Sequence, residues 1–155
     1  MFYLQNSLTP LAVRAGLTVA NKKSLFQNLA SLSKQAHGVD PHAVLDRLME
    51  RERLGSTGFG SGIAIPHGKI EGLTKVIAIC LRLARPIDFE AIDDLPVDLV
   101  FMLLSPADGG AEHLKALAAV SRMMRDKEFV AKLRGAATDD ALYALLNSQE
   151  MVTAA

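Results

Sequence analysis

Hydrophobic residues recur at three- and four-residue spacings along the first third of the chain, which predicts two amphipathic helices. Residues 23–36 form the first, which should end before the His37-Gly38 pair. Asp40 and Pro41 are typical of the N-cap and first position of a second helix, which we expect to continue to the segment 51–53. The expected buried positions are Leu25, Phe26, Leu29, Leu32 and Ala36 in the first helix and Val44, Leu45, Leu48 and Met49 in the second.

The middle of the chain carries short, continuous apolar runs at residues 63–65, 76–83 and 97–104. The last two have too few polar positions for strands with one wet face, so they predict central strands that are covered on both sides. Helices before and after these strands predict an α/β fold, in which helices flank both faces of a mixed β-sheet.

The helical spacing returns from Glu112 onward, and Asp126 and Thr138 are suitable N-caps for two further helices. In the helix that follows Glu112 we expect one buried face, made of Leu114, Leu117, Ala118, Ser121 and Met124. Glycine-rich residues 55–62 are predicted to form a loop.

The composition excludes several classes of protein. The chain has 155 residues, of which 50% are hydrophobic, enough for one domain over residues 1–155 with its core within residues 8–148. Seventeen Lys plus Arg balance seventeen Asp plus Glu, so no excess charge favours nucleic acid or an anionic membrane. Residues 1–6 lack the basic segment followed by an apolar stretch that is typical of a secretory signal, and no apolar run approaches about 20 residues. We therefore expect a soluble, cytoplasmic protein with no membrane insertion, in which the single cysteine, Cys80, packs as a small hydrophobe.

Four glycines lie within residues 55–62, and a backbone so rich in glycine can turn several N–H groups toward an anion. The alternative is a flexible connection, which the glycines alone do not exclude. The spacing rejects the dinucleotide fingerprint, and Ile70 stands where a nucleotide triphosphatase loop needs Ser or Thr. The candidate phosphate-binding residues are Ser56, Thr57, Gly58 and Gly60.

His67 follows Pro66 directly after the apolar run 63–65. Proline fixes the local backbone and ends strand pairing, so we expect His67 to project from the sheet edge toward the glycine-rich loop. Neutral imidazole is a nucleophile near pH 7, because its pKa is ~6.5. His67 is therefore a candidate nucleophile, the alternative being a surface histidine beside a turn. Phe59 is the nearest large apolar side chain in sequence and a candidate partner contact.

The segment Gly-Ser-Thr-Gly-Phe-Gly-Ser-Gly-Ile-Ala-Ile-Pro-His-Gly-Lys at 55–69 resembles the active-site signature of the fructose/mannitol-type IIA proteins of the bacterial phosphotransferase system. The resemblance is strongest to the nitrogen-regulatory branch of that family. It extends to residues 86–99, to Glu112-His-Leu and to the helical C-terminal part, so it covers most of the chain.

The resemblance implies a phosphoryl carrier whose histidine accepts phosphate from a phosphohistidine carrier protein of the HPr or NPr type. His67 occupies the position of that histidine, while His113 and Arg51 match the family's second histidine and the arginine ahead of the glycine loop. Phosphoryl transfer spreads charge over the equatorial oxygens, which the fork of donors of Arg51 and a hydrogen bond from His113 would neutralise.

Two functions fit such a phosphotransferase component. The first is a nitrogen-related regulator, whose binding to target proteins changes when His67 is phosphorylated. The alternative is a sugar-transport IIA component that passes phosphate to a separate IIB domain of a fructose/mannitol-type permease. No cofactor and no metal are expected, since His37 and His42 have no metal-binding spacing. The acidic residues Asp88, Glu90, Asp93 and Asp94 are expected to be solvated in a turn.

Overall fold

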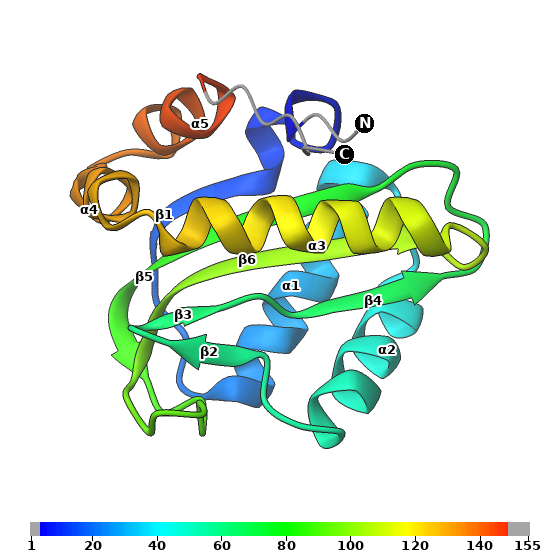
Figure 1. The fold of residues 1–155 in the computed structure, drawn as a ribbon, viewed down its shortest axis with the longest axis horizontal. Helices are drawn as coiled ribbons and strands as arrows, with labels where there is room; N and C mark the ends of the chain where they lie inside the picture. Colours follow the sequence, from blue (N-terminus) through cyan, green and yellow to red (C-terminus); the bar gives the residue numbers. More distant parts are fainter. Residues whose placement is uncertain (1–3, 149–155) are drawn as a thin grey trace.

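The computed structural model describes residues 4–148, and a six-stranded mixed β-sheet lies at its centre (Figure 1). The strand order is β1-β5-β6-β3-β2, and β4 pairs with β6 on the same side as β3. β5 is antiparallel to β6, whereas β1 is parallel to β5, and β3 and β4 are parallel to β6. The strands are β1 (Val13–Leu17), β2 (Gly58–Gly60), β3 (Ile63–Ala64), β4 (His67–Ile70), β5 (Ile77–Ile87) and β6 (Val97–Pro106).

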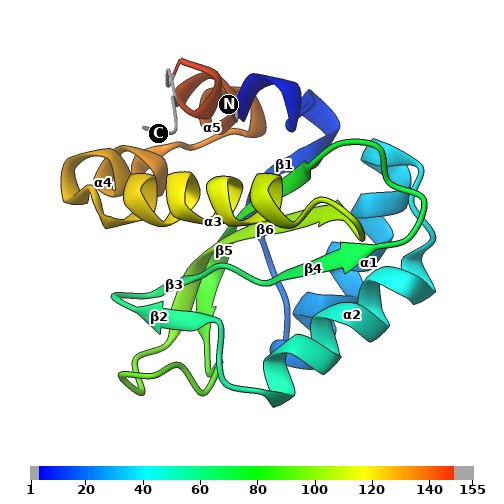
Figure 2. The same ribbon diagram turned by 45° about the vertical axis from the view of Figure 1, so that its right-hand side comes forward.

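Five α-helices within residues 4–148 flank this sheet, with α1 and α2 on one face and α3 on the other (Figure 2). α5 lies beside β1 at one end of the sheet. The α/β fold with helices on both faces is therefore confirmed. The helices are α1 (Lys22–His37), α2 (Pro41–Arg53), α3 (Gly110–Arg125), α4 (Lys127–Gly135) and α5 (Asp139–Asn147), and two short 3-10 turns, η1 (Leu4–Asn6) and η2 (Pro10–Ala12), precede β1.

Capping side chains fix where the helices begin, as their sequence indicated. Asp40 accepts a hydrogen bond from the backbone of α2, Asp126 from α4 and Thr138 from α5. Each satisfies N–H groups that have no partner within the helix itself. Gly38 ends α1 at φ 70°, a left-handed conformation that glycine adopts without steric cost.

The core is built around β5 and β6, whose central residues are buried on both faces. Cys80 is fully buried in β5, and burial raises the pKa of its thiol to about 12, so it packs as an inert hydrophobe as expected. Met123 and Met124 are also buried, on the side of α3 that faces the sheet.

The strand pairing around Pro66 differs from the prediction. The segment predicted as a loop contains β2, which pairs antiparallel with β3. Pro66 interrupts the pairing with β6 without ending it, because its carbonyl still accepts a hydrogen bond of 3.0 Å from the backbone N–H of Leu103. Proline lacks only the donor, so the ladder resumes at His67, which lies opposite Leu103.

The buried face of α3 is also displaced from the predicted one. Leu114 is 67% exposed and Ala118 is exposed, although both were expected to be buried. Two small residues, Ala116 and Ala119, face the sheet instead, which lets α3 pack closely against β6. The residues of α3 that are buried are His113, Ala116, Ala119, Val120, Met123 and Met124.

A glycine in β2 provides a test of the packing beside the site. A Cβ atom on Gly58 would lie 2.8 Å from the Cβ of Ala91 and 2.9 Å from the ring of Phe89, which is fully buried. We expect Gly58→Ala to lower the free energy of unfolding by about 1–3 kcal/mol through overpacking, as measured by urea denaturation. Gly135→Ala is the matched control, because nothing lies within 4 Å of its Cβ position at the exposed end of α4. Equal stabilities for the two variants would contradict the close contact.

Candidate functional site

A cleft of about 560 Å³, bounded by α2, β4 and α3, contains three of the residues that the sequence singled out. His67 is the first residue of β4, Arg51 lies in the last turn of α2, and His113 lies in the first turn of α3. The cleft therefore joins three elements that the β4–β6 pairing brings to one edge of the sheet.

The hydrogen bonds of His67 indicate which of its ring nitrogens can react. Nδ1 lies 2.8 Å from the carbonyl oxygen of Ile65, and a carbonyl can only accept, so Nδ1 carries the proton. Nε2 then holds the lone pair, and it accepts a hydrogen bond of 3.2 Å from Nε of Arg51. The ring nitrogen of His67 with an available lone pair is therefore Nε2, and a cationic donor already lies beside it.

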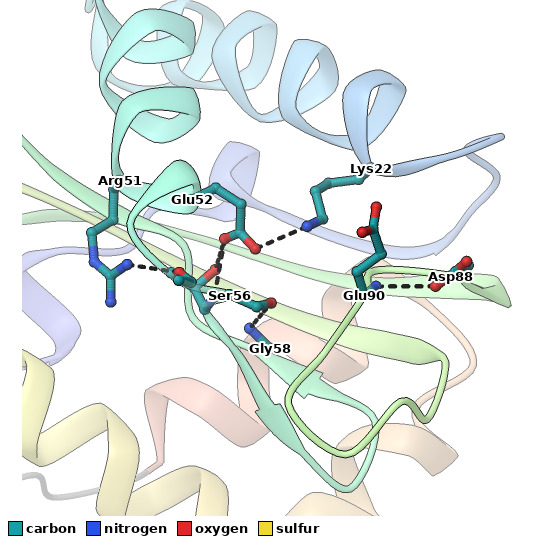
Figure 3. Close-up of polar contacts among 9 residues, drawn as sticks. Lys22, Arg51, Glu52, Ser56, Gly58, Asp88 and Glu90 are labelled. Atoms are coloured by element: carbon teal, nitrogen blue, oxygen red, sulfur yellow. Dashed lines mark hydrogen bonds and ion pairs between the residues drawn. The ribbon is translucent and has the colours of Figure 1, made fainter.

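Arg51 is held in place by a second hydrogen bond, which Figure 3 shows together with its neighbours. Its Nη1 donates to the carbonyl oxygen of Gly55 at 2.8 Å, which fixes one side of the planar guanidinium while Nε faces His67. Such a rigid fork suits the oxygens of a phosphoryl group.

His113 lies across the cleft from His67, with 5.7 Å between the two ring centroids. Only 8% of His113 is exposed, and its Nδ1 lies 2.7 Å from Oγ of Ser105 at the end of β6. Since α3 begins at Gly110, the ring sits near a helix N-terminus, a region favourable to negative charge.

Burial lowers the pKa of both histidines. For His67 desolvation is the largest cause and the charge of Arg51 acts in the same direction, while the hydrogen bond to Ile65 and the charge of Glu52 raise the pKa by less. For His113 desolvation is the largest cause of the lowered pKa, and repulsion from Lys69, and from His67 when that ring is protonated, acts in the same direction. Both imidazoles are therefore neutral near pH 7, and His67 keeps the lone pair that a nucleophile needs.

Glu52 ties the glycine-rich segment to α2 and to the start of α1 (Figure 3). Its carboxylate accepts from the backbone N–H and the hydroxyl of Thr57, at 3.0 and 2.6 Å, and from Nζ of Lys22 at 2.9 Å. Burial raises the pKa of Glu52, but the hydrogen bonds from Thr57 and Lys22 outweigh it, so the pKa lies below its ordinary value. The carboxylate is thus directed toward this network and leaves Arg51 free to face His67.

The four predicted phosphate-binding residues do not line the cleft that contains His67. The N–H of Thr57 is bonded to Glu52, and the N–H of Gly58 donates to Oγ of Ser56 at 3.1 Å. None of the residues 56–60 lines the cleft. Phosphate binding by Ser56, Thr57, Gly58 and Gly60 stays a prediction. In the structure the Gly55 carbonyl just before them holds Arg51, and the Thr57 carbonyl accepts from the backbone N–H of Ile65 after β3.

Comparison with known proteins identifies the family. Residues 6–149 match the family described as phosphoenolpyruvate-dependent sugar phosphotransferase system, EIIA 2. The chain belongs to this family. Its match to a nitrogen regulatory protein from Bradyrhizobium diazoefficiens is 45% identical over 139 residues, 90% of this chain and 91% of the relative.

Other relatives of this IIA chain include both a solved structure and a transport component. The crystal structure of the nitrogen regulatory protein IIA-Ntr from Neisseria meningitidis matches with a TM-score of 0.83 at 31% identity, covering 92% of this chain and 97% of that one. A PTS system fructose-specific EIIA component from Haloferax volcanii is 43% identical over 115 residues, 74% of this chain and 75% of the relative. The resemblance inferred from residues 55–69 is confirmed, and the nitrogen regulatory relatives match over more of the IIA chain than the fructose-specific one.

The large exposed apolar side chains in the cleft beside His67 are Leu54 and Leu114. Phe59, the candidate from the sequence, does not line the cleft. The two leucines are 83% and 67% exposed and line the cleft of the IIA chain. Phe59 is half-buried against the core, and the guanidinium of Arg125 lies 6.0 Å from its ring centroid. Phe59 was predicted because it is close to His67 in the sequence. The leucines are more distant in the sequence, but they lie at the end of α2 and near the start of α3, which both border the cleft.

The remaining candidates lie away from the cleft. Asp88 and Asp93 are exposed but accept backbone N–H bonds that shape the turns around them, so they are more than solvated charges. His37 lies 2.9 Å from a backbone carbonyl of β5, and His42 is exposed. Across residues 4–148, no group of three or more His, Cys, Asp and Glu side chains could hold a metal ion. The same part of the chain has no helix that is both long and apolar enough to cross a membrane.

The lowered pKa of His67 predicts a pH dependence. The pKa of His67 lies below the ordinary histidine value of ~6.5, so the midpoint of its NMR titration should lie below pH 6.5. Phosphoryl acceptance should decline over the same range, because protonation removes the lone pair. Arg51→Gln removes a positive charge that lowers this pKa, so the titration should move to higher pH. Arg47→Gln, an exposed residue that also lines the cleft, is the control and should leave it unchanged. A wild-type pKa above 6.5 would contradict the geometry.

Proposed function

We propose that this IIA domain is a cytoplasmic phosphoryl carrier in which Nε2 of His67 accepts phosphate from a phosphohistidine carrier protein of the HPr or NPr type. The observation that carries this proposal is the pair of hydrogen bonds of His67, one holding the proton on Nδ1 and one bringing Arg51 to Nε2. The phosphorus–nitrogen bond of the donor breaks as the bond to Nε2 forms. The proton stays on Nδ1, which donates to the Ile65 carbonyl throughout, so no base is needed.

Arg51 and His113 assist the transfer without carrying phosphate. The transition state is loose and spreads negative charge over three oxygens, so positioned donors are the main contribution a protein can make. Arg51 already lies beside Nε2, and His113 faces His67 across the cleft. One such preorganised donor is commonly worth ~2.7–4 kcal/mol, so replacing either residue should slow transfer by about two to three orders of magnitude.

A protein partner, rather than a small molecule, suits the surroundings of His67. The cleft is open, as it must be for a histidine on another protein to reach Nε2 in line. Leu54 and Leu114 border it with unusually exposed apolar surface. Covering one leucine fully contributes about 1.5–3 kcal/mol before the costs of association, enough to matter for a transient complex.

The biological role we propose is regulation of target proteins by the phosphorylation state of His67. The relatives named nitrogen regulatory proteins favour it. A phosphoryl group adds up to about two negative charges at pH 7. The cleft already holds Glu50 and Glu71 beside Arg47, Arg51 and Lys69, so the sign of its charge would change for any docked partner. The fructose-specific relative favours the alternative, transfer of phosphate to a separate IIB domain.

Removing His67 is the direct test of the carrier role. We expect His67→Ala to abolish phosphorylation by phosphoenolpyruvate and the general phosphotransfer proteins, because no other residue in the cleft presents a neutral lone pair beside Arg51. Mass spectrometry would detect acid-labile phosphate, and ³¹P NMR would report the Nε2 linkage. His42→Ala, which replaces an exposed histidine of α2, should be labelled like the wild type. Undiminished labelling of His67→Ala, with an unchanged circular dichroism melt, would sink the assignment.

Binding of target proteins tests the regulatory role. Phosphorylated and unphosphorylated protein should capture different partners from the native cytoplasm, and Leu54→Ser and Leu114→Ser should weaken capture severalfold. Leu95→Ser is the control, since Leu95 is 52% exposed but does not line the cleft. Equal capture by every form would remove the basis of the switch. Phosphorylation of a sugar in membrane extracts, dependent on His67, would then favour the transport alternative.

A further inference from the structure

β6 ends in a buried hydroxyl directly behind the active-site cleft. The strand is apolar from Leu99 to Leu104, and then Ser105, which is fully buried, lies opposite Lys69 of β4. The Oγ atom of Ser105 lies 2.7 Å from Nδ1 of His113 and makes no other hydrogen bond within residues 4–148. Within residues 4–148 this contact is also the only hydrogen bond of the His113 ring.

The direction of this hydrogen bond follows from counting donors and acceptors. His113 is neutral, so one ring nitrogen carries a proton and the other a lone pair. If Nδ1–H donated to Ser105, the hydroxyl proton would be buried without an acceptor, at a cost comparable to a lost hydrogen bond. If the hydroxyl donates to Nδ1, its proton is satisfied and the imidazole proton must lie on Nε2.

We propose that Ser105 is a positioning residue that donates to Nδ1 of His113 and thereby keeps the His113 proton on Nε2. Resting on the proposed function, this makes His113 a hydrogen-bond donor toward a phosphoryl group on His67. With the opposite tautomer His113 would turn a lone pair toward the phosphoryl oxygens and repel them. The two active-site histidines thus hold opposite tautomers: the Ile65 carbonyl keeps the proton of His67 on Nδ1, and the Ser105 hydroxyl keeps that of His113 on Nε2.

Nitrogen NMR of the unphosphorylated protein tests the tautomer directly. With ¹⁵N-labelled histidine at pH 8, Nε2 of His113 should have the shift of a protonated nitrogen and Nδ1 that of an unprotonated one. Ser105→Ala should give averaged shifts, because no donor then holds Nδ1. Ser33→Ala is the matched control: Ser33 is equally buried and donates to the Leu29 carbonyl at 2.7 Å, so its loss should leave the His113 shifts unchanged.

Transfer kinetics test whether the tautomer matters. Ser105→Ala should slow phosphoryl transfer from the phosphorylated carrier protein about 3- to 10-fold at saturation, the effect of one hydrogen bond, without raising KM. Ser105→Cys, which keeps a weak donor of similar size, should recover part of the rate. In a His113→Ala background the same substitution should have no further effect, because Ser105 acts only through His113.

Three results would overturn the inference: a wild-type His113 protonated on Nδ1, unchanged shifts in Ser105→Ala, or equal slowing by Ser105→Ala with and without His113. A different result would count against the proposed function alone. If wild-type protein were never phosphorylated on His67, the carrier role would fail, yet the NMR shifts would still decide the direction of the bond between Ser105 and His113.

Discussion

The parallel ladder between β4 and β6 is the constraint on which the site depends. It places His67 of β4 opposite Leu103 of β6, a buried strand that is paired along both of its edges. β6 then continues through a short connection into α3, which carries His113. One strand therefore sets the position of both histidines, and its last residues include Ser105.

The backbone beside Pro66 supplies the hydrogen-bond acceptor that fixes the tautomer of His67. The carbonyls of Gly62 and Pro66 accept from β6, so the Ile65 carbonyl between them points away from β6 and accepts a hydrogen bond from Nδ1 of His67. On that side β3 pairs with β2, and the Ile65 N–H donates to the Thr57 carbonyl at 3.0 Å. Pro66 keeps the strand in register with β6 through its own carbonyl, because proline lacks only the N–H donor.

Charge in the cleft is arranged so that a cation lies beside a neutral imidazole. Burial and Arg51 both hold the pKa of His67 low, which keeps its lone pair available next to the group that we propose neutralises phosphate. Glu52 could have quenched this arrangement, because it follows Arg51 directly in the chain. Successive residues of a helix point in different directions, and the Glu52 carboxylate turns to Thr57 and Lys22 instead.

The amino-acid sequence by itself determined the local features and the family to which the chain belongs. Caps such as Asp40 and Thr138, the two apolar central strands, and the signature containing His67 depend on neighbours in the chain, where spacing and residue type are sufficient. Only the tertiary structure decided that Leu114 faces outward, that Pro66 leaves the ladder in register, and that the N–H groups of Thr57 and Gly58 are already bonded. These outcomes depend on which distant strand or side chain arrives opposite a residue, as Ser105 arrives behind His113, and no local pattern of polarity contains that information.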